Sequence, residues 1–94
     1  MAISVQLPKD GEGFEAEVNI QGFHVVLRAV HTGYGPVAQV YDAQTKKWRV
    51  PPEFAGDLDD AKARADAIAR GLYTIAPPPK GQFPQTLDWH KTGG

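Results

Sequence analysis

The amino-acid sequence predicts an α+β fold: a four- to five-stranded antiparallel meander with one C-terminal helix packed on one face, followed by an extended Pro/Gly-rich tail. Apolar and polar residues alternate through most of the first half of the chain, which is typical of half-buried strands. Residues 57–72 instead repeat their apolar side chains every three or four positions, which is typical of an amphipathic helix. Residues 76–94 follow neither period, so we expect one domain over residues 1–75 and a tail after it.

Two strands are predicted before the first tight turn. In residues 14–20 the apolar side chains occupy the even positions, and Glu15, Glu17 and Asn19 occupy the odd positions. Because successive side chains of a strand point to opposite faces, this segment has one apolar face and one polar face. A shorter alternating stretch, residues 2–7, predicts a further strand at the N-terminus.

Gln21 and Gly22 are predicted to form a two-residue turn into the next strand, because glycine readily adopts the positive φ that a type I′ turn requires. The turn length fixes the pairing of the two strands, and a shift by one residue would mix their faces. The predicted pairs are apolar on one face and polar on the other: Ile20 with Phe23, Val18 with Val25, Ala16 with Leu27 and Phe14 with Ala29, then Glu15 with Arg28 and Asn19 with His24.

A third strand is predicted at residues 37–42, and a return strand at residues 47–50. We expect Trp48 to lie opposite Val40 and to join the apolar face of the sheet, and Val50 to lie on the same face. The length of the connecting turn is not fixed by the sequence, so a slip of this strand stays open.

The helix is predicted over residues 57–72. Asp57 is placed to cap its first turn, with Asp60 three residues later in the position of a capping box, and Gly71 is placed to end it. Opposite charges four residues apart predict ion pairs between Asp60 and Arg64, Lys62 and Asp66, and Asp66 and Arg70. The buried stripe is predicted to consist of Leu58, Ala61, Ala65, Ile68 and Leu72.

The sheet face away from the predicted helix holds side chains of mixed polarity: Glu15, Glu17, His24, Val26, Arg28, Val30, Val37, Gln39, Tyr41, Lys47 and Arg49. A face that met only water would seldom hold three valines and a tyrosine together. Three explanations stay open. The tail could fold over the face with Phe83, Leu87 and Trp89, a protein partner or a second copy could bind there, or a nucleic acid could bind there.

The preferred hypothesis is a non-enzymatic domain that binds a protein partner or self-associates through this face. The partner-binding residues are predicted to be Val26, Arg28, Val30, Val37, Tyr41 and Arg49. The alternative is a nucleic-acid-binding module that uses Arg28, Tyr41, Lys47 and Arg49. A formal net charge of -1 disfavours this alternative, because binding to phosphates requires an excess of Lys and Arg.

An antiparallel sheet followed by one packed helix resembles the plant ethylene-response and integrase-arm type of DNA-binding domain. The resemblance covers residues 14–72 and rests on element order, and it implies that the sheet rather than the helix would enter the DNA groove. Those families carry a dense run of arginine and tryptophan on the reading strands, which this sequence lacks. Arg28, Lys47, Trp48 and Arg49 match that run loosely. The chain is also similar to small bacterial domains with a meander and one helix, a resemblance that implies no activity.

No catalytic, cofactor-binding or metal-binding residue is predicted. The chain has no cysteine, and His24, His31 and His90 lack the spacing of a metal site. The sequence also lacks a nucleophile elbow and a phosphate-binding loop. It has no secretory signal pattern and no run near the roughly 18 apolar residues that span a membrane. We therefore expect a cytoplasmic protein that needs no cofactor and does not contact a membrane.

Overall fold

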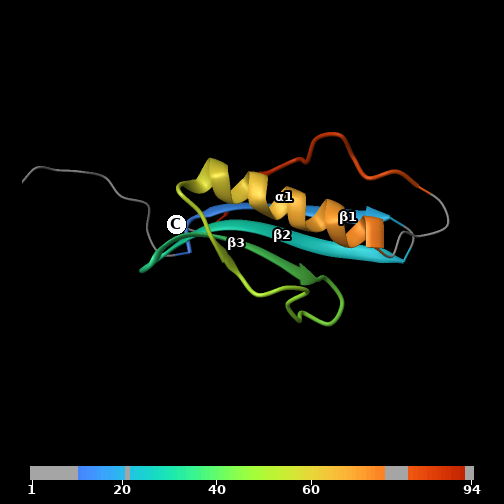
Figure 1. Cartoon of the computed structure of the whole chain (residues 1–94), viewed down its shortest axis with the longest axis horizontal. Coiled ribbons are helices and arrows are strands. Elements are labelled where there is room, and N and C mark those ends of the chain that lie inside the picture. The colour runs from blue at the N-terminus through green and yellow to red at the C-terminus, as the bar shows by residue number, and fades with distance from the viewer. Residues whose placement is uncertain (1–10, 21, 76–80, 93–94) are drawn as a thin grey trace, which may run out of the picture.

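The computed structural model describes residues 11–20, 22–75 and 81–92, and it confirms the predicted α+β fold (Figure 1). The strand predicted at residues 2–7 lies outside the described residues. The strands form one antiparallel sheet in the order β4-β3-β2-β1-β5. The elements are β1 (Gly13–Ile20), β2 (Phe23–Thr32), β3 (Gly35–Asp42), β4 (Glu53–Phe54), α1 (Leu58–Ile75) and β5 (His90–Thr92).

The predicted register of the first hairpin is confirmed at every pair. Gly22 has a φ of 78°, which allows a two-residue turn to join β1 and β2. Each face of the hairpin therefore keeps the composition that the sequence predicts. Val18 and Val25 belong to the core that faces α1, whereas Glu15 and Arg28 pair on the opposite face.

The turn after β3 is longer than a tight hairpin turn. The Asp42 carboxylate accepts hydrogen bonds from the N–H groups of Gln44 at 2.9 Å and Thr45 at 2.8 Å. Lys46 takes a positive φ of 62°, a conformation that is uncommon outside glycine. The N–H of Asp42 then donates to the carbonyl of Lys47 at 2.8 Å. These bonds set where the returning chain meets β3.

Residues 47–50 do not form the predicted strand. A single isolated bridge joins Tyr41 to Trp48, so the prediction that Trp48 pairs with Val40 is wrong by one residue. Because side chains alternate between faces, this slip moves the indole away from the core. The two prolines after Val50 supply no N–H group, and pairing with β3 resumes only at the two-residue β4.

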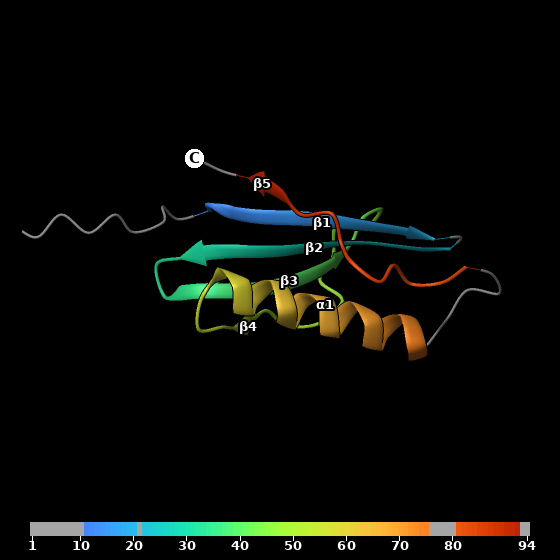
Figure 2. The same ribbon diagram turned by 90° about the horizontal axis from the view of Figure 1, so that it is seen from above.

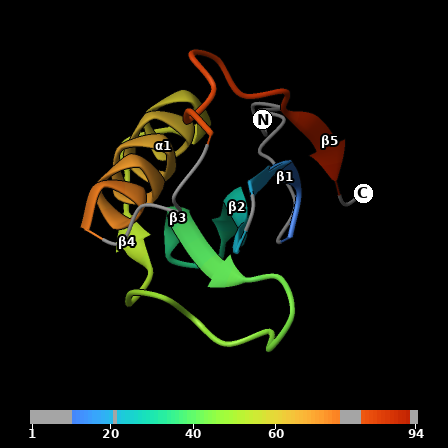
Figure 3. The ribbon, with the colours of Figure 1, turned by 90° about the vertical axis from the view of Figure 1, so that its right-hand side faces the viewer.

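Helix α1 lies across β2 and β3 and closes one face of the sheet, called here the covered face (Figures 2 and 3). Ala61, Ala65 and Ala69 have no exposed surface, and their small side chains let the helix approach the strands closely. Ala69 was not part of the predicted stripe. The buried residues of this core are Val18, Phe23, Val25, Leu27, Ala29, Ala38, Val40, Ala61, Ala65 and Ala69.

Asp57 caps the helix as predicted, and its carboxylate accepts the N–H of Asp60 at 2.7 Å. Asp60 in turn accepts the N–H of Gly56 at 2.8 Å, one residue before the capping-box position. The Arg64 guanidinium lies 2.9 Å from Asp60 and 2.7 Å from Glu53, which ties α1 to β4. The predicted pair of Asp66 with Arg70 is also present, whereas Lys62 pairs with Asp59 instead of Asp66.

The helix continues to Ile75, so the prediction that Gly71 ends it is wrong. Packing against the sheet accounts for the extra turn. The Tyr73 ring meets the edge of the Phe23 ring with 5.2 Å between centroids, and Leu72 packs against the same core. Burial of these side chains outweighs the modest cost of glycine inside a helix.

Residues 81–92 run back beside the helix and complete the covered face above β1 (Figures 2 and 3). Phe83, Leu87 and Trp89 pack against the core there and anchor the C-terminal segment. The Arg70 guanidinium lies 4.6 Å from the Phe83 ring centroid and donates to the carbonyl of Gln85 at 2.8 Å. The chain then adds β5 to the outer edge of β1, a strand that was not predicted.

Candidate functional site

The face of the sheet opposite α1 is called here the open face. Strand register arranges most positions of this face in three rows that cross the sheet, and Asn19 pairs with His24 outside these rows. The first row holds Glu17, Val26, Tyr41 and Trp48. The second holds His90, Glu15, Arg28 and Gln39. The third holds Thr92, Gly13, Val30, Val37 and Phe54.

The three valines of the open face form its floor. Val26 is 7% exposed, and Val30 and Val37 are each 4% exposed, although the helix lies on the other side of the sheet. Because so little of their surface is exposed, these valines do not form the accessible apolar centre that was expected from the sequence. The valines therefore pack beneath the exposed side chains of the face and contribute few atoms that a partner could contact.

Large aromatic side chains line the β3–β4 side of the open face. Trp48 is 50% exposed and Phe54 is 62% exposed. The Trp48 indole meets the Tyr41 ring edge-on, with 5.5 Å between centroids and 84° between planes. Tyr41, Trp48 and Phe54 are called here the aromatic margin. Trp48 and Phe54 were missed as site residues because the face of each depends on the turn after β3, which the sequence did not fix.

Ion pairs connect β1 to β2 across the open face. Glu17 bonds to His24, and the Glu15 carboxylate lies 3.4 Å from Arg28 Nε. The second pair is not aligned as a hydrogen bond, and Arg28 Nε has no hydrogen-bond partner within the described residues. The same holds for the side-chain carbonyl of Gln39 beside it. Buried polar atoms usually have hydrogen-bond partners, so Arg28 Nε and the Gln39 side-chain carbonyl are available to bond water or a bound molecule.

Tyr41 keeps its proton well into the alkaline range. Burial raises the pKa of the Tyr41 hydroxyl above its usual 10.0, and the Glu15 carboxylate raises it further. Arg28 partly opposes these effects, and Glu17 adds to them. At neutral pH Tyr41 is therefore an uncharged ring with a hydroxyl group that can donate or accept a hydrogen bond.

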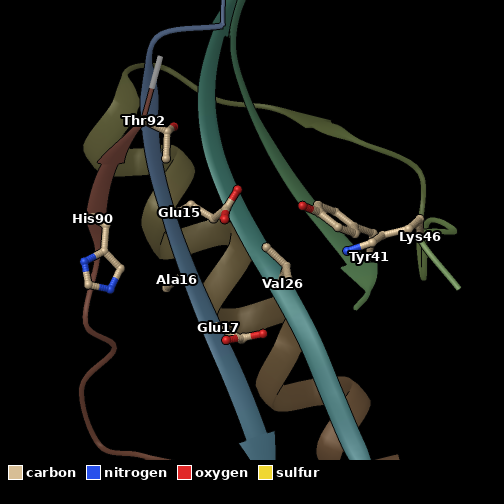
Figure 4. A pocket seen from close by; sticks show the side chains of 8 residues that line it. All are labelled: Glu15, Ala16, Glu17, Val26, Tyr41, Lys46, His90 and Thr92. Atoms are coloured by element: carbon tan, nitrogen blue, oxygen red, sulfur yellow. The ribbon is translucent and has the colours of Figure 1, made fainter. Parts of the chain in front are cut away.

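A shallow pocket of about 280 Å³ lies over β1 and β2 on the open face. Figure 4 shows Glu15 and Glu17 projecting from β1, with Tyr41 and Lys46 on the far side of Val26. The remaining lining residues are Ala16, His90 and Thr92. Nowhere in the described ranges do three or more His, Asp or Glu side chains gather as a metal site.

Two further predictions about this face are corrected by the structure. Arg49 lies on the covered side, with its guanidinium 5.9 Å from the centroid of the Phe23 ring, so it does not border the open face. Phe83, Leu87 and Trp89 also pack on the covered side, which rules out the explanation that they fold over the open face. Of the six predicted contact residues, Arg28 and Tyr41 stand on the open face and the three valines lie beneath it.

The comparisons with known proteins found no relative of the chain. No family model, no curated protein and no solved structure matches the chain. In the part of the chain that the structure describes, no helix combines the length and apolar character needed to cross a membrane.

Proposed function

We propose that the chain is a non-enzymatic protein-binding domain that makes its contacts through the aromatic margin of the open face. A cytoplasmic location suits this role, because a chain without cysteine forms no disulfide and does not depend on an oxidising compartment. The observation that carries the proposal is the exposure of Trp48 and Phe54, half or more of each side chain, on the face that α1 leaves open.

Aromatic side chains with this exposure are typical of protein interfaces. Tryptophan and tyrosine dominate interaction hot spots because they bury a large area and lose few rotamers. Here the aromatic margin is supported by a rigid floor, since Tyr41 lies in the same row as the buried Val26 and Phe54 lies opposite the buried Val37. Tyr41 and Phe54 belong to strands of the sheet, and a bridge to Tyr41 holds Trp48, so part of the ordering that binding requires is already present.

A nucleic-acid-binding module is the second candidate, because the exposed Trp48 follows Lys46 and Lys47. Several observations favour protein instead. Glu15 and Glu17 stand on the same face and would repel phosphates, and Glu15 already engages Arg28. Arg49 stacks on the covered side, so the basic residues do not converge on one surface.

Photo-crosslinking in cells tests the proposal. A benzophenone amino acid replaces either Trp48 or Ile75, and the adducts are identified by mass spectrometry. Ile75 is the matched control because it is 82% exposed but lies at the end of α1, away from the open face. We expect discrete protein adducts from position 48 and none of these from position 75. The same adducts from both positions, or none from position 48, would contradict the proposal.

An oligonucleotide titration separates the two candidates. Binding through phosphates weakens steeply as salt is added, because condensed counterions are released from the nucleic acid. We expect no binding of a random single-stranded oligonucleotide even at low salt. Salt-sensitive binding that is lost in Trp48→Ala would favour the nucleic-acid module.

A further inference from the structure

We propose that the occupant of the open face is a second copy of this chain, with Trp48 of each copy seated in the pocket of the other. This inference rests on the proposed function and identifies the partner. A contact of this kind is symmetric: the same patch serves both subunits, and the assembly closes as a dimer.

The first row of the open face supplies the geometry. Glu17 stands at one end of the row and Trp48 at the other, with Val26 and Tyr41 between them. A two-fold axis parallel to the strands and above the middle of the row exchanges its two ends. The exposed Trp48 of one copy then falls over the β1 side of the other copy's pocket, which extends from Glu17 across Val26 to Tyr41.

The pocket suits an indole in shape and chemistry. Its volume of about 280 Å³ is small and open on one side, which matches a single inserted side chain better than a cofactor. Val26 and the Tyr41 ring offer apolar contacts, and the Glu15 and Glu17 carboxylates can accept the indole N–H. Glu17 is reachable, because 58% of its side chain is exposed.

Charge is complementary across the same axis. The β1 end of the open face carries Glu17, which stays 58% exposed beside its bond to His24, whereas the turn after β3 carries the exposed Lys46. Exchanging the two ends places Lys46 of each copy near the acidic end of the other. The axis also keeps the strands of both sheets nearly aligned, which is a common arrangement for two sheets packed face to face.

Sedimentation equilibrium with a charge exchange tests this arrangement. Glu17→Lys should weaken the dimer about tenfold or more, because two basic ends then meet, and Lys46→Glu should do the same with two acidic ends. An equimolar mixture of the two variants should recover an association close to that of the parent, since both contacts of the mixed dimer are again attractive. Both positions are exposed, so we expect each variant to fold, and circular dichroism of each variant serves as the check.

Trp48→Ala and Ile75→Ala give a second readout. A hot-spot tryptophan predicts about thirtyfold weaker dimerisation for Trp48→Ala, and Ile75→Ala should leave the dimer unchanged. A parent that stays monomeric up to millimolar concentration would overturn the second copy as occupant. Crosslinks from position 48 to another protein would then still uphold the proposed function. A dimer that is indifferent to the charge variants, or that the mixture does not recover, would overturn the two-fold arrangement.

Discussion

The two faces of the sheet bury valines of the same strand by different means. On the covered face, Val25 has no exposed surface because α1 lies over it. On the open face, its neighbour Val26 is 7% exposed without a helix above it, and it lies between Glu17 and Tyr41 in its row. The covered face is apolar, and α1 and the C-terminal segment pack over it. The open face combines an apolar floor with charged pairs and exposed aromatic rings.

The covered face is used up by packing within the chain, whereas the open face leaves large side chains exposed. A helix that rests on alanines cannot move away without exposing the whole core. On the open face, exposed side chains such as Glu17 and Trp48 are free to change rotamer when a partner binds. The valines of the open face are buried, and the exposure of Trp48 and Phe54 is the reason we propose the aromatic margin as the contact surface.

The largest effect is expected from a charge placed beneath the helix. Ala65→Glu buries a carboxylate without a partner on the covered face, which should destabilise the fold by about 3–5 kcal/mol. Ala67→Glu places the same side chain on the exposed side of α1 and should change stability by less than about 0.5 kcal/mol. Urea unfolding of both variants measures the difference. Equal destabilisation would mean that the two sides of α1 are not distinct.

Neighbouring valines of β2 sharpen the comparison. Val25→Ala leaves a cavity that the helix and the opposite strands cannot fill, and should cost about 2–3 kcal/mol. Val26→Ala should cost about 1 kcal/mol, because the surrounding side chains of the open face can collapse onto the gap. Thermal or urea unfolding of the two variants provides the test. A larger loss for Val26→Ala would show that the open face is packed as tightly as the covered face.

The open face should also respond to alkaline pH. Because the pKa of Tyr41 is higher in the folded chain than its usual 10.0, its contribution to stability is complete below that pH. The contribution is lost as pH rises through the folded pKa. We expect the parent to lose more stability than Tyr41→Phe above pH 10.0, measured by urea unfolding across that range. Identical pH profiles of the two proteins would contradict this expectation.

The helix on the covered face should respond at acid pH. The Gly56 N–H and Arg64 hold the pKa of the Asp60 carboxyl below its usual 3.8. Its stabilising effect is therefore present above pH 3.8 and is lost as pH falls through the folded pKa. Unfolding of Asp60→Asn should show a small deficit relative to the parent at neutral pH that shrinks as the solution is acidified. A deficit that does not change with pH would exclude this cause.

The hairpin could be predicted because two independent features agree on its register. Gly22 sets the turn length, and the alternation on both sides of the turn allows only one pairing that keeps the faces separate. The helix cap at Asp57 could also be predicted, since a cap depends on bonds within a few residues.

The aromatic margin could not be predicted, because its placement depends on the length of the turn after β3. The Asp42 hydrogen bonds and the positive φ of Lys46 form a turn that places Trp48 opposite Tyr41 rather than Val40, and the same slip sends Arg49 to the other side of the sheet. No residue-level preference indicates that lysine will adopt this conformation. The strand β5 is similarly hidden, since it pairs with β1 from the far end of the chain.

The two tryptophans test the central claim most directly, because each reports on one side of the sheet. Trp48 stands on the open face, and Trp89 packs against the core of the covered face. Their indole N–H signals can be followed in NMR spectra from micromolar to millimolar protein. We expect the Trp48 signal to shift with concentration while the Trp89 signal stays in place. A shift of the Trp89 signal alone, or of neither signal, would contradict the assignment of the open face as the surface where copies meet.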